Sequence, residues 1–254
     1  DWPDNYKMLG FTPWEGPDGG RLDSEVTEFL DAGDAPVVVT LGTSAASANS
    51  QVFDQALAAL DSLQERAVVL ASNDALAAHL TERAGPQHLV HPFIPLAPLL
   101  GRSKAIVHSG AHGTNSLALL AGVPSVVVPC LYDQVAHGRR QRELGTGAWV
   151  RKDRDLAAAV AAVLDPANGY FERAQAFSEL ISKEDGTAWA ITEIERILDS
   201  TASLPTRLTL KAGSVPALPH REGSRAPTPV DRCTLKPDER TLHLGSPAVQ
   251  RGVG

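Results

Sequence analysis

The stretch AIVHSGAHGTNSLALLAGVPSVVVPCLYDQVAHGRRQRELGTG, residues 105–147, decides the fold. It begins with a short apolar run, 105–107, which predicts a buried strand. A Ser- and Gly-rich turn follows and leads into helix-forming residues at 115–121. A Gly-Val-Pro sequence ends that helix, and residues 125–129 predict the next strand. Strand, turn, helix and strand in this order predict a right-handed βαβ unit of a parallel sheet.

The turn in this unit, residues 109–114, is a candidate anion site. It contains two glycines and lies between a predicted strand and a predicted helix. Backbone N–H groups at the positive end of a helix attract anions. In an open parallel sheet such a turn also lies at the carboxyl edge, where ligands bind. The sequence therefore predicts a diphosphate site at this turn.

The alternation of strand and helix extends to both sides of this unit. Residues 93–100 are expected to begin extended and end in a brief helical turn, and Ser24 is expected to cap the first helix. The β-branched runs and the apolar periodicity predict the remaining elements. These are strands at 36–41, 67–71, 88–90 and 148–150, and helices at 24–32, 50–66, 74–84, 153–164, 171–181 and 187–198. The fold class predicted is α/β, a doubly wound parallel sheet with helices on both faces.

The ends of the chain differ in composition from its centre. Residues 1–35 read as a Pro- and Gly-rich connector followed by a short helix, and residues 36–198 as the folded domain. The segment 199–254 has seven prolines and no aromatic residue, so we expect it to be disordered. Because the chain begins at Asp1 without a methionine, we also expect that an upstream part is missing.

The overall composition excludes several classes of protein. With 254 residues, 43% hydrophobic and 21% charged, the chain is ordinary globular material, and its net charge of −7 argues against a nucleic-acid partner. Cys130 and Cys233 have no metal-ligand spacing, so neither a disulfide framework nor a metal site is expected. No apolar run reaches the length of a membrane span, and no secretory signal opens the chain. We expect a cytoplasmic protein.

The motifs of the central stretch resemble a known signature. His-x-Gly-x-x-Gly-Thr begins at His108, and Ala-Gly-Val-Pro, a Val-rich strand, Asp-Gln and a closing Gly-x-Gly follow. This order and spacing is similar to that of family 1 UDP-glycosyltransferases, and in particular to bacterial sterol- and macrolide-type members. The resemblance covers residues 1–198. It implies the Rossmann-like C-terminal half of a GT-B fold, which binds the nucleotide sugar.

The resemblance implies roles for nine residues in holding a UDP-sugar donor, with no cofactor and no metal. His108 would hold and stabilise the diphosphate. Phe93 would stack on uracil, and Ile94 would meet the base through its backbone. Asp133 and Gln134 would bind the sugar hydroxyls. The remaining positions belong to the turn and the helix start: Gly110, His112, Gly113 and Thr114.

Simpler interpretations of the same residues stay open. His108 could be a polar strand end, His112 a solvent-facing turn residue and Phe93 a core residue. Asp133 and Gln134 could cap a helix that runs through Arg142. The chain also departs from common family residues at four positions, which are Leu96, His112, Ser116 and His137.

The function expected from the resemblance is transfer of a hexose from a nucleotide diphosphate sugar to a hydroxyl of a small hydrophobic acceptor. In the family, the acceptor pocket and the catalytic base belong to an N-terminal half, and residues 1–254 hold no second set of strands and helices for it. We therefore expect a donor module that is inactive until an N-terminal domain is supplied in cis or in trans. The alternatives are a non-catalytic nucleotide-sugar-binding module that partners a complete transferase, and nucleotide-sugar epimerisation.

Overall fold

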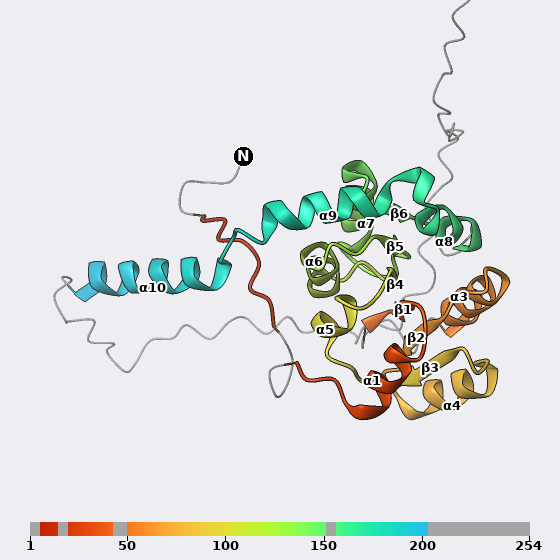
Figure 1. Cartoon of the computed structure of the whole chain (residues 1–254). Helices are drawn as coiled ribbons and strands as arrows, with labels where there is room; N and C mark the ends of the chain where they lie inside the picture. Colours follow the sequence, from red (N-terminus) through yellow and green to blue (C-terminus); the bar gives the residue numbers. More distant parts are fainter. Residues whose placement is uncertain (1–5, 15–19, 43–49, 151–155, 203–254) are drawn as a thin grey trace, which may run out of the picture. The chain divides into compact units, whose positions relative to one another are not determined.

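The computed structural model describes residues 6–14, 20–42, 50–150 and 156–202. Its centre is a sheet of six strands in the order β3-β2-β1-β4-β5-β6, with every neighbouring pair parallel (Figure 1). The strands are β1 (Val37–Thr40), β2 (Ala67–Leu70), β3 (His88–His91), β4 (Ala105–His108), β5 (Ser125–Val127) and β6 (Gly147–Trp149). The predicted parallel α/β sheet is confirmed.

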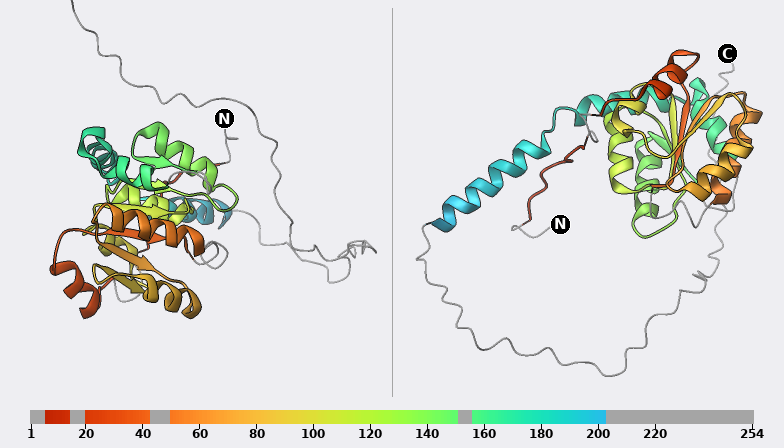
Figure 2. Two further views of the ribbon diagram at one scale, coloured as in Figure 1. Left: turned by 90° about the vertical axis from the view of Figure 1, so that its right-hand side faces the viewer. Right: turned by 90° about the horizontal axis from the view of Figure 1, so that it is seen from below.

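Helices cover both faces of the sheet, as the two further views show (Figure 2). Successive side chains of a strand point to opposite faces. Accordingly, Val37 and Val39 of β1 belong to one core, together with α3 (Ser50–Ser62), α4 (Asp74–Arg83) and α8 (Leu156–Leu164). Val38 belongs to the other core, together with α1 (Ser24–Asp31), α5 (Leu96–Leu100) and α6 (His112–Leu120). Because β1 is buried on both faces, its sequence is a continuous β-branched run rather than an alternation.

The helices follow the predicted order, with differences at their ends. Asp23, not Ser24, caps α1, because its carboxylate accepts the N–H of Val26. Helix α6 begins at His112, three residues before the predicted start at 115. Gly113 lies in its first turn, where a glycine does not prevent helix formation. The helices are α1 (Ser24–Asp31), α3 (Ser50–Ser62), α4 (Asp74–Arg83), α5 (Leu96–Leu100), α6 (His112–Leu120), α7 (Gln134–Leu144), α8 (Leu156–Leu164), α9 (Tyr170–Ile181) and α10 (Gly186–Ala202).

The chain changes winding direction between β1 and β4. It runs outward from β1 through β2 to β3, then returns to place β4 on the other side of β1. The register pairs Thr40 with His108, so the carboxyl ends of these two strands are neighbours. This is the switch point of a doubly wound sheet, the place where such folds bind ligands.

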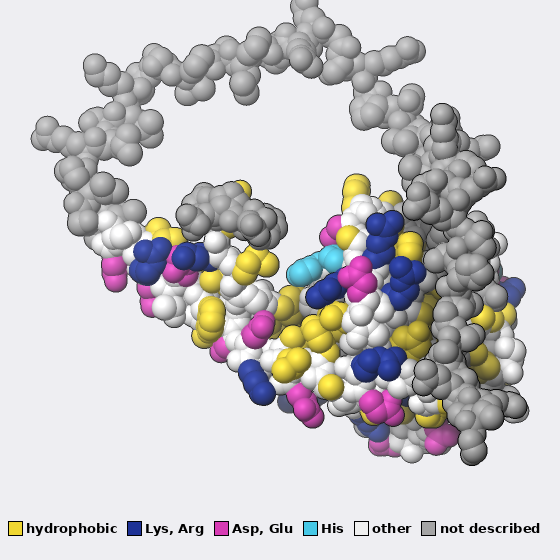
Figure 3. Space-filling model, turned by 90° about the horizontal axis from the view of Figure 1, so that it is seen from above, with side chains coloured by type: hydrophobic (Ala, Val, Ile, Leu, Met, Phe, Trp, Pro, Cys, Tyr) yellow, Lys and Arg dark blue, Asp and Glu magenta, His cyan; other side chains and the backbone are white. Residues whose placement is uncertain are grey.

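Several sequence predictions fall outside the described residues. They concern most of the expected disordered segment (203–254), the start of the helix predicted at 153, and parts of the connector. The last described helix, α10, continues to Ala202, past the predicted end at Leu198. It carries exposed apolar side chains, Trp189 and Ile194 among them, and Figure 3 shows exposed apolar side chains among charged ones on one face. None of the helices in the described ranges is both long and apolar enough for a membrane span.

Candidate functional site

The site is built around His108, the last residue of β4. Its side chain is completely buried, and its Nδ1 accepts the N–H of Gly110 over 3.1 Å. Gly110 has a φ of +86°, and a Cβ added there would lie 2.7 Å from Cγ1 of Val127. Both the left-handed backbone and the close approach of Val127 require glycine at this position. The glycine of the motif is therefore what lets the chain turn from β4 toward α6.

A second imidazole, that of His137, binds the carbonyl group of Gly110. Nδ1 of His137, on α7, lies 2.7 Å from the carbonyl oxygen of Gly110. A carbonyl can only accept, so Nδ1 of His137 carries a proton. At His108 the situation is reversed, because Nδ1 accepts and the proton of the neutral ring is on Nε2. Two histidines in opposite tautomers thus hold the N–H and the C=O of Gly110.

His108 is electrically neutral at physiological pH. Burial, and next the Coulombic effect of His137, lower the pKa of His108 to about 3. Its Nε2–H is buried and has no hydrogen-bond partner among the residues that the structure describes. An unpaired buried donor costs roughly 1–3 kcal/mol. The site therefore contains a donor that an added acceptor would satisfy.

The N-terminus of α6 lies directly after the turn. Its N-cap is Ala111, which has no side-chain oxygen to accept the first-turn N–H groups. His112 and Gly113 are exposed, and there is open space where a Cβ on Gly113 would be. The first-turn N–H groups, including that of Thr114, are available to an anion at the positive end of a nine-residue helix.

The Asp-Gln pair at the start of α7 divides into two roles. Asp133 is the N-cap residue, but its side chain makes no capping hydrogen bond and is 64% exposed. Gln134 is buried, and its Oε1 accepts the N–H groups of Cys130 and Leu131 over 2.8 Å each. The Asp133 carboxylate is exposed and can meet a ligand, whereas the Gln134 oxygen shapes the loop before it. The capping alternative therefore does not apply to the Asp133 side chain.

The predicted base-binding residues lie at the same edge, after β3. Phe93 is 52% exposed, so the alternative of a core residue does not hold for it, whereas Ile94 is buried in the core. Strands lie about 4.8 Å apart, so the ends of β3 and β4, three places apart in the sheet, are separated by about 14 Å. The structure places Phe93 and the His108 turn on one edge but does not bring them into contact. Only an extended ligand could reach both.

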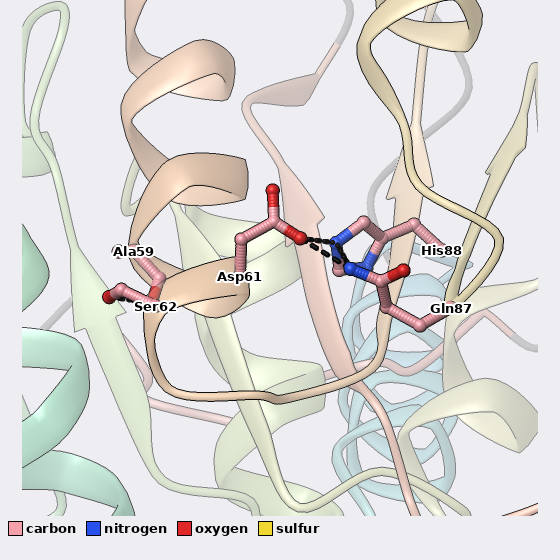
Figure 4. Close-up of polar contacts among 5 residues, drawn as sticks. All are labelled: Ala59, Asp61, Ser62, Gln87 and His88. Carbon is pink, nitrogen blue, oxygen red and sulfur yellow. Dashed lines mark hydrogen bonds and ion pairs between the residues drawn. The ribbon is translucent and has the colours of Figure 1, made fainter.

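A second buried histidine, His88, lies at the opposite edge, at the start of β3. Its Nε2 lies 2.9 Å from Oδ1 of Asp61, to which the Gln87 side chain also donates (Figure 4). When Nε2–H of His88 donates to this carboxylate, the ring atom left without a partner is Nδ1, which is an acceptor and not a donor. His88 resembles His108 in burial but lies away from the turn, which makes it a natural control.

Sequence reasoning did not include His137 among the site residues. It appeared only as a departure from a common family residue. The signal that could have identified it is its spacing, since His137 follows Asp133 by four residues and so lies on the same side of a helix. Within the described ranges, no group of three or more His, Cys, Asp or Glu side chains is arranged to hold a metal ion.

Comparison with known proteins shows that the chain is similar to sugar-transferring enzymes. The family described as "Erythromycin biosynthesis protein CIII-like, C-terminal domain" matches over residues 54–187. O-mycaminosyltylonolide 6-deoxyallosyltransferase of Streptomyces fradiae is 31% identical over 81% of this chain and 48% of that enzyme. dTDP-epi-vancosaminyltransferase of Amycolatopsis orientalis is 32% identical over 61% of this chain and 39% of that enzyme.

A solved structure shows the same fold. Glycosyltransferase VinC in complex with dTDP has a TM-score of 0.63 and 22% identity, over 78% of this chain and 50% of VinC. The chain thus spans about half the length, or less, of the proteins that it matches.

Proposed function

Because the chain belongs to the family of the erythromycin biosynthesis protein CIII-like C-terminal domain, and because proteins similar to it are named as glycosyltransferases, we propose that its β4–α6 turn binds the diphosphate of a nucleotide sugar. In this proposal the chain supplies the donor half of a glycosyl-transfer reaction. The acceptor and the catalytic base belong to another domain, because transfer needs an acceptor hydroxyl held in line and a group that takes its proton.

One observation carries the proposal: the buried Nε2–H of His108 has no described partner, and the turn after His108 leads directly into a helix N-terminus without a side-chain cap. A phosphate oxygen is a strong acceptor that would satisfy the imidazole, and the first-turn N–H groups of α6 would hold further phosphate oxygens. As the bond to the sugar breaks, negative charge grows on the leaving diphosphate. Donors already in place stabilise that charge in the transition state.

The rest of the carboxyl edge fits the other parts of such a donor. The exposed Asp133 carboxylate can accept hydrogen bonds from sugar hydroxyls, and the half-exposed ring of Phe93 offers a surface for a base. The nucleotide is either uridine or thymidine diphosphate. The VinC structure contains dTDP, and one relative is named for a dTDP-sugar, so both nucleotides belong in the test.

The experiment compares two asparagine variants by titration calorimetry with UDP and dTDP. In His108→Asn the amide oxygen can still accept the Gly110 N–H, but the Nε2–H donor is lost, so we expect affinity to fall at least about tenfold. His88→Asn removes an equally buried histidine at the opposite edge and should leave affinity unchanged. Equal affinities for wild type and His108→Asn would contradict the proposal.

A further inference from the structure

Gly110 links two parts of the site that are otherwise separate. Its carbonyl accepts from Nδ1 of His137, and the other ring nitrogen of His137 lies 3.7 Å from Oδ2 of Asp133. One imidazole therefore lies between the diphosphate turn and the carboxylate assigned to the sugar. We call His137, Gly110 and Asp133 the imidazole bridge.

The bridge depends on the protonation state of His137. With a single proton, on Nδ1, the ring holds Gly110 and presents a lone pair on Nε2 toward Asp133. With two protons, Nδ1–H still holds Gly110, and Nε2–H faces the carboxylate and can orient it. The second proton also adds a positive charge beside the turn, where an anion would bind.

Other ionisable groups face His137 from the neighbouring elements. His108 on β4 is close enough for the charge of His137 to contribute to its lowered pKa. His112 on α6 has its ring centroid 5.7 Å from that of His137, and Asp133 is on α7 itself. His108 stays neutral above about pH 3, so His112 is the other histidine near the turn whose contribution the test must separate from that of His137.

We propose that His137 is a positioning residue that joins the diphosphate turn to the Asp133 carboxylate, and that its second proton strengthens donor binding. This inference rests on the proposed function, because it concerns the same nucleotide sugar. It adds a regulation of that site: the affinity for a nucleotide sugar rises when His137 takes up its second proton.

The test is calorimetry with a nucleotide sugar, UDP-glucose and dTDP-glucose in turn, between pH 8 and pH 5.5. The diphosphate of such a diester does not titrate in this range, so the pH response comes from the protein. We expect wild-type affinity to be about fivefold higher at pH 5.5 than at pH 8, which is the effect of one added charge interaction of about 1 kcal/mol.

The matched variant is His137→Asn. Its amide nitrogen can take the place of Nδ1 and still donate to Gly110, but it cannot bind a second proton. We expect this variant to show no pH response in its affinity. His112→Asn should keep the wild-type slope, whatever its effect on affinity itself. A flat wild-type profile, or an unchanged slope in His137→Asn, would overturn the proposal.

A measurement without ligand separates this inference from the proposed function. Two-dimensional ¹H–¹⁵N spectra of the imidazoles should show neutral His137 with its proton on Nδ1 and His108 with its proton on Nε2. If no nucleotide sugar binds at any pH, the donor assignment fails. The positioning role then stands only if neutral His137 shows this tautomer and Asp133→Asn shifts its Nε2 signal. A neutral His137 ring with its single proton on Nε2 would overturn the positioning role.

Discussion

At the scale of single residues, His108 combines a structural and a chemical role in one ring. Nδ1 accepts from the Gly110 backbone, and Nε2–H has no described partner. The resemblance predicts a histidine at the phosphate, and the structure adds that Nε2 is the ring nitrogen that has a proton to donate. The sequence could not supply that detail, because the tautomer depends on how the backbone of the turn directs the Gly110 N–H toward Nδ1.

The lowered pKa of His108 predicts an acid-sensitive fold. In the unfolded chain the imidazole titrates near pH 6.5, and in the folded protein only near pH 3. Between these values the unfolded state binds one more proton, so the stability from neutral His108 is complete above pH 6.5 and is lost as the pH falls. As the pH falls, the free energy of unfolding of wild type should decrease by up to about 1.4 kcal/mol more per pH unit than that of His108→Asn. Urea unfolding at several pH values checks this, and parallel slopes would contradict it.

Asp133 and Gln134 should respond differently to substitution. Asp133→Ala removes an exposed carboxylate, so it should weaken binding of a nucleotide sugar without changing the melting temperature or the affinity for the free nucleotide diphosphate. Gln134→Ala removes the acceptor of two backbone N–H groups, so it should lower the melting temperature as well. Calorimetry and thermal unfolding together measure both effects. Equal losses of nucleotide and nucleotide-sugar affinity in Asp133→Ala would mean that the carboxylate does not meet the sugar.

At the scale of elements, the strands were predictable and some helix details were not. A strand buried on both faces of a sheet must be apolar throughout. The continuous apolar runs of β1, β2 and β4 therefore predict buried strands. Helix α7 has a weak apolar pattern because much of its packing relies on buried polar contacts and on a close approach at a glycine. The buried Gln141 bonds to Asn115 of α6 and to Thr146, and Gly138 lets the helix approach Trp149. The spacing of apolar residues along the sequence does not predict contacts of this kind.

Gly138 provides a test of how α7 packs on β6. A Cβ at this position would lie 2.6 Å from Cδ1 of Trp149, so Gly138→Ala should destabilise the protein by about 1–3 kcal/mol despite its better helix propensity. Gly113→Ala, in the first turn of α6, is the matched control, since its Cβ would meet nothing within 4 Å. Urea unfolding should show a loss of stability in the first variant only. Two variants of equal stability would show that Trp149 can move aside.

At the scale of the whole molecule, the order of the strands decides where chemistry can occur. The return from β3 to β4 across β1 places the motif at the switch point, with Phe93 on the same edge. The motif identified the turn, but the sequence alone did not give the strand order or the distance between the two ends of the site. These depend on pairing between segments that are far apart in the chain.

The central claim is that a nucleotide diphosphate binds at the β4–α6 turn. Amide ¹H–¹⁵N spectra recorded while UDP or dTDP is added to the full chain test it most directly, because each backbone N–H reports its own surroundings. We expect the largest shifts at Gly110, Gly113 and Thr114, with residues around His88 unchanged. Shifts centred on the opposite edge of the sheet, or no shifts at millimolar nucleotide, would contradict the claim.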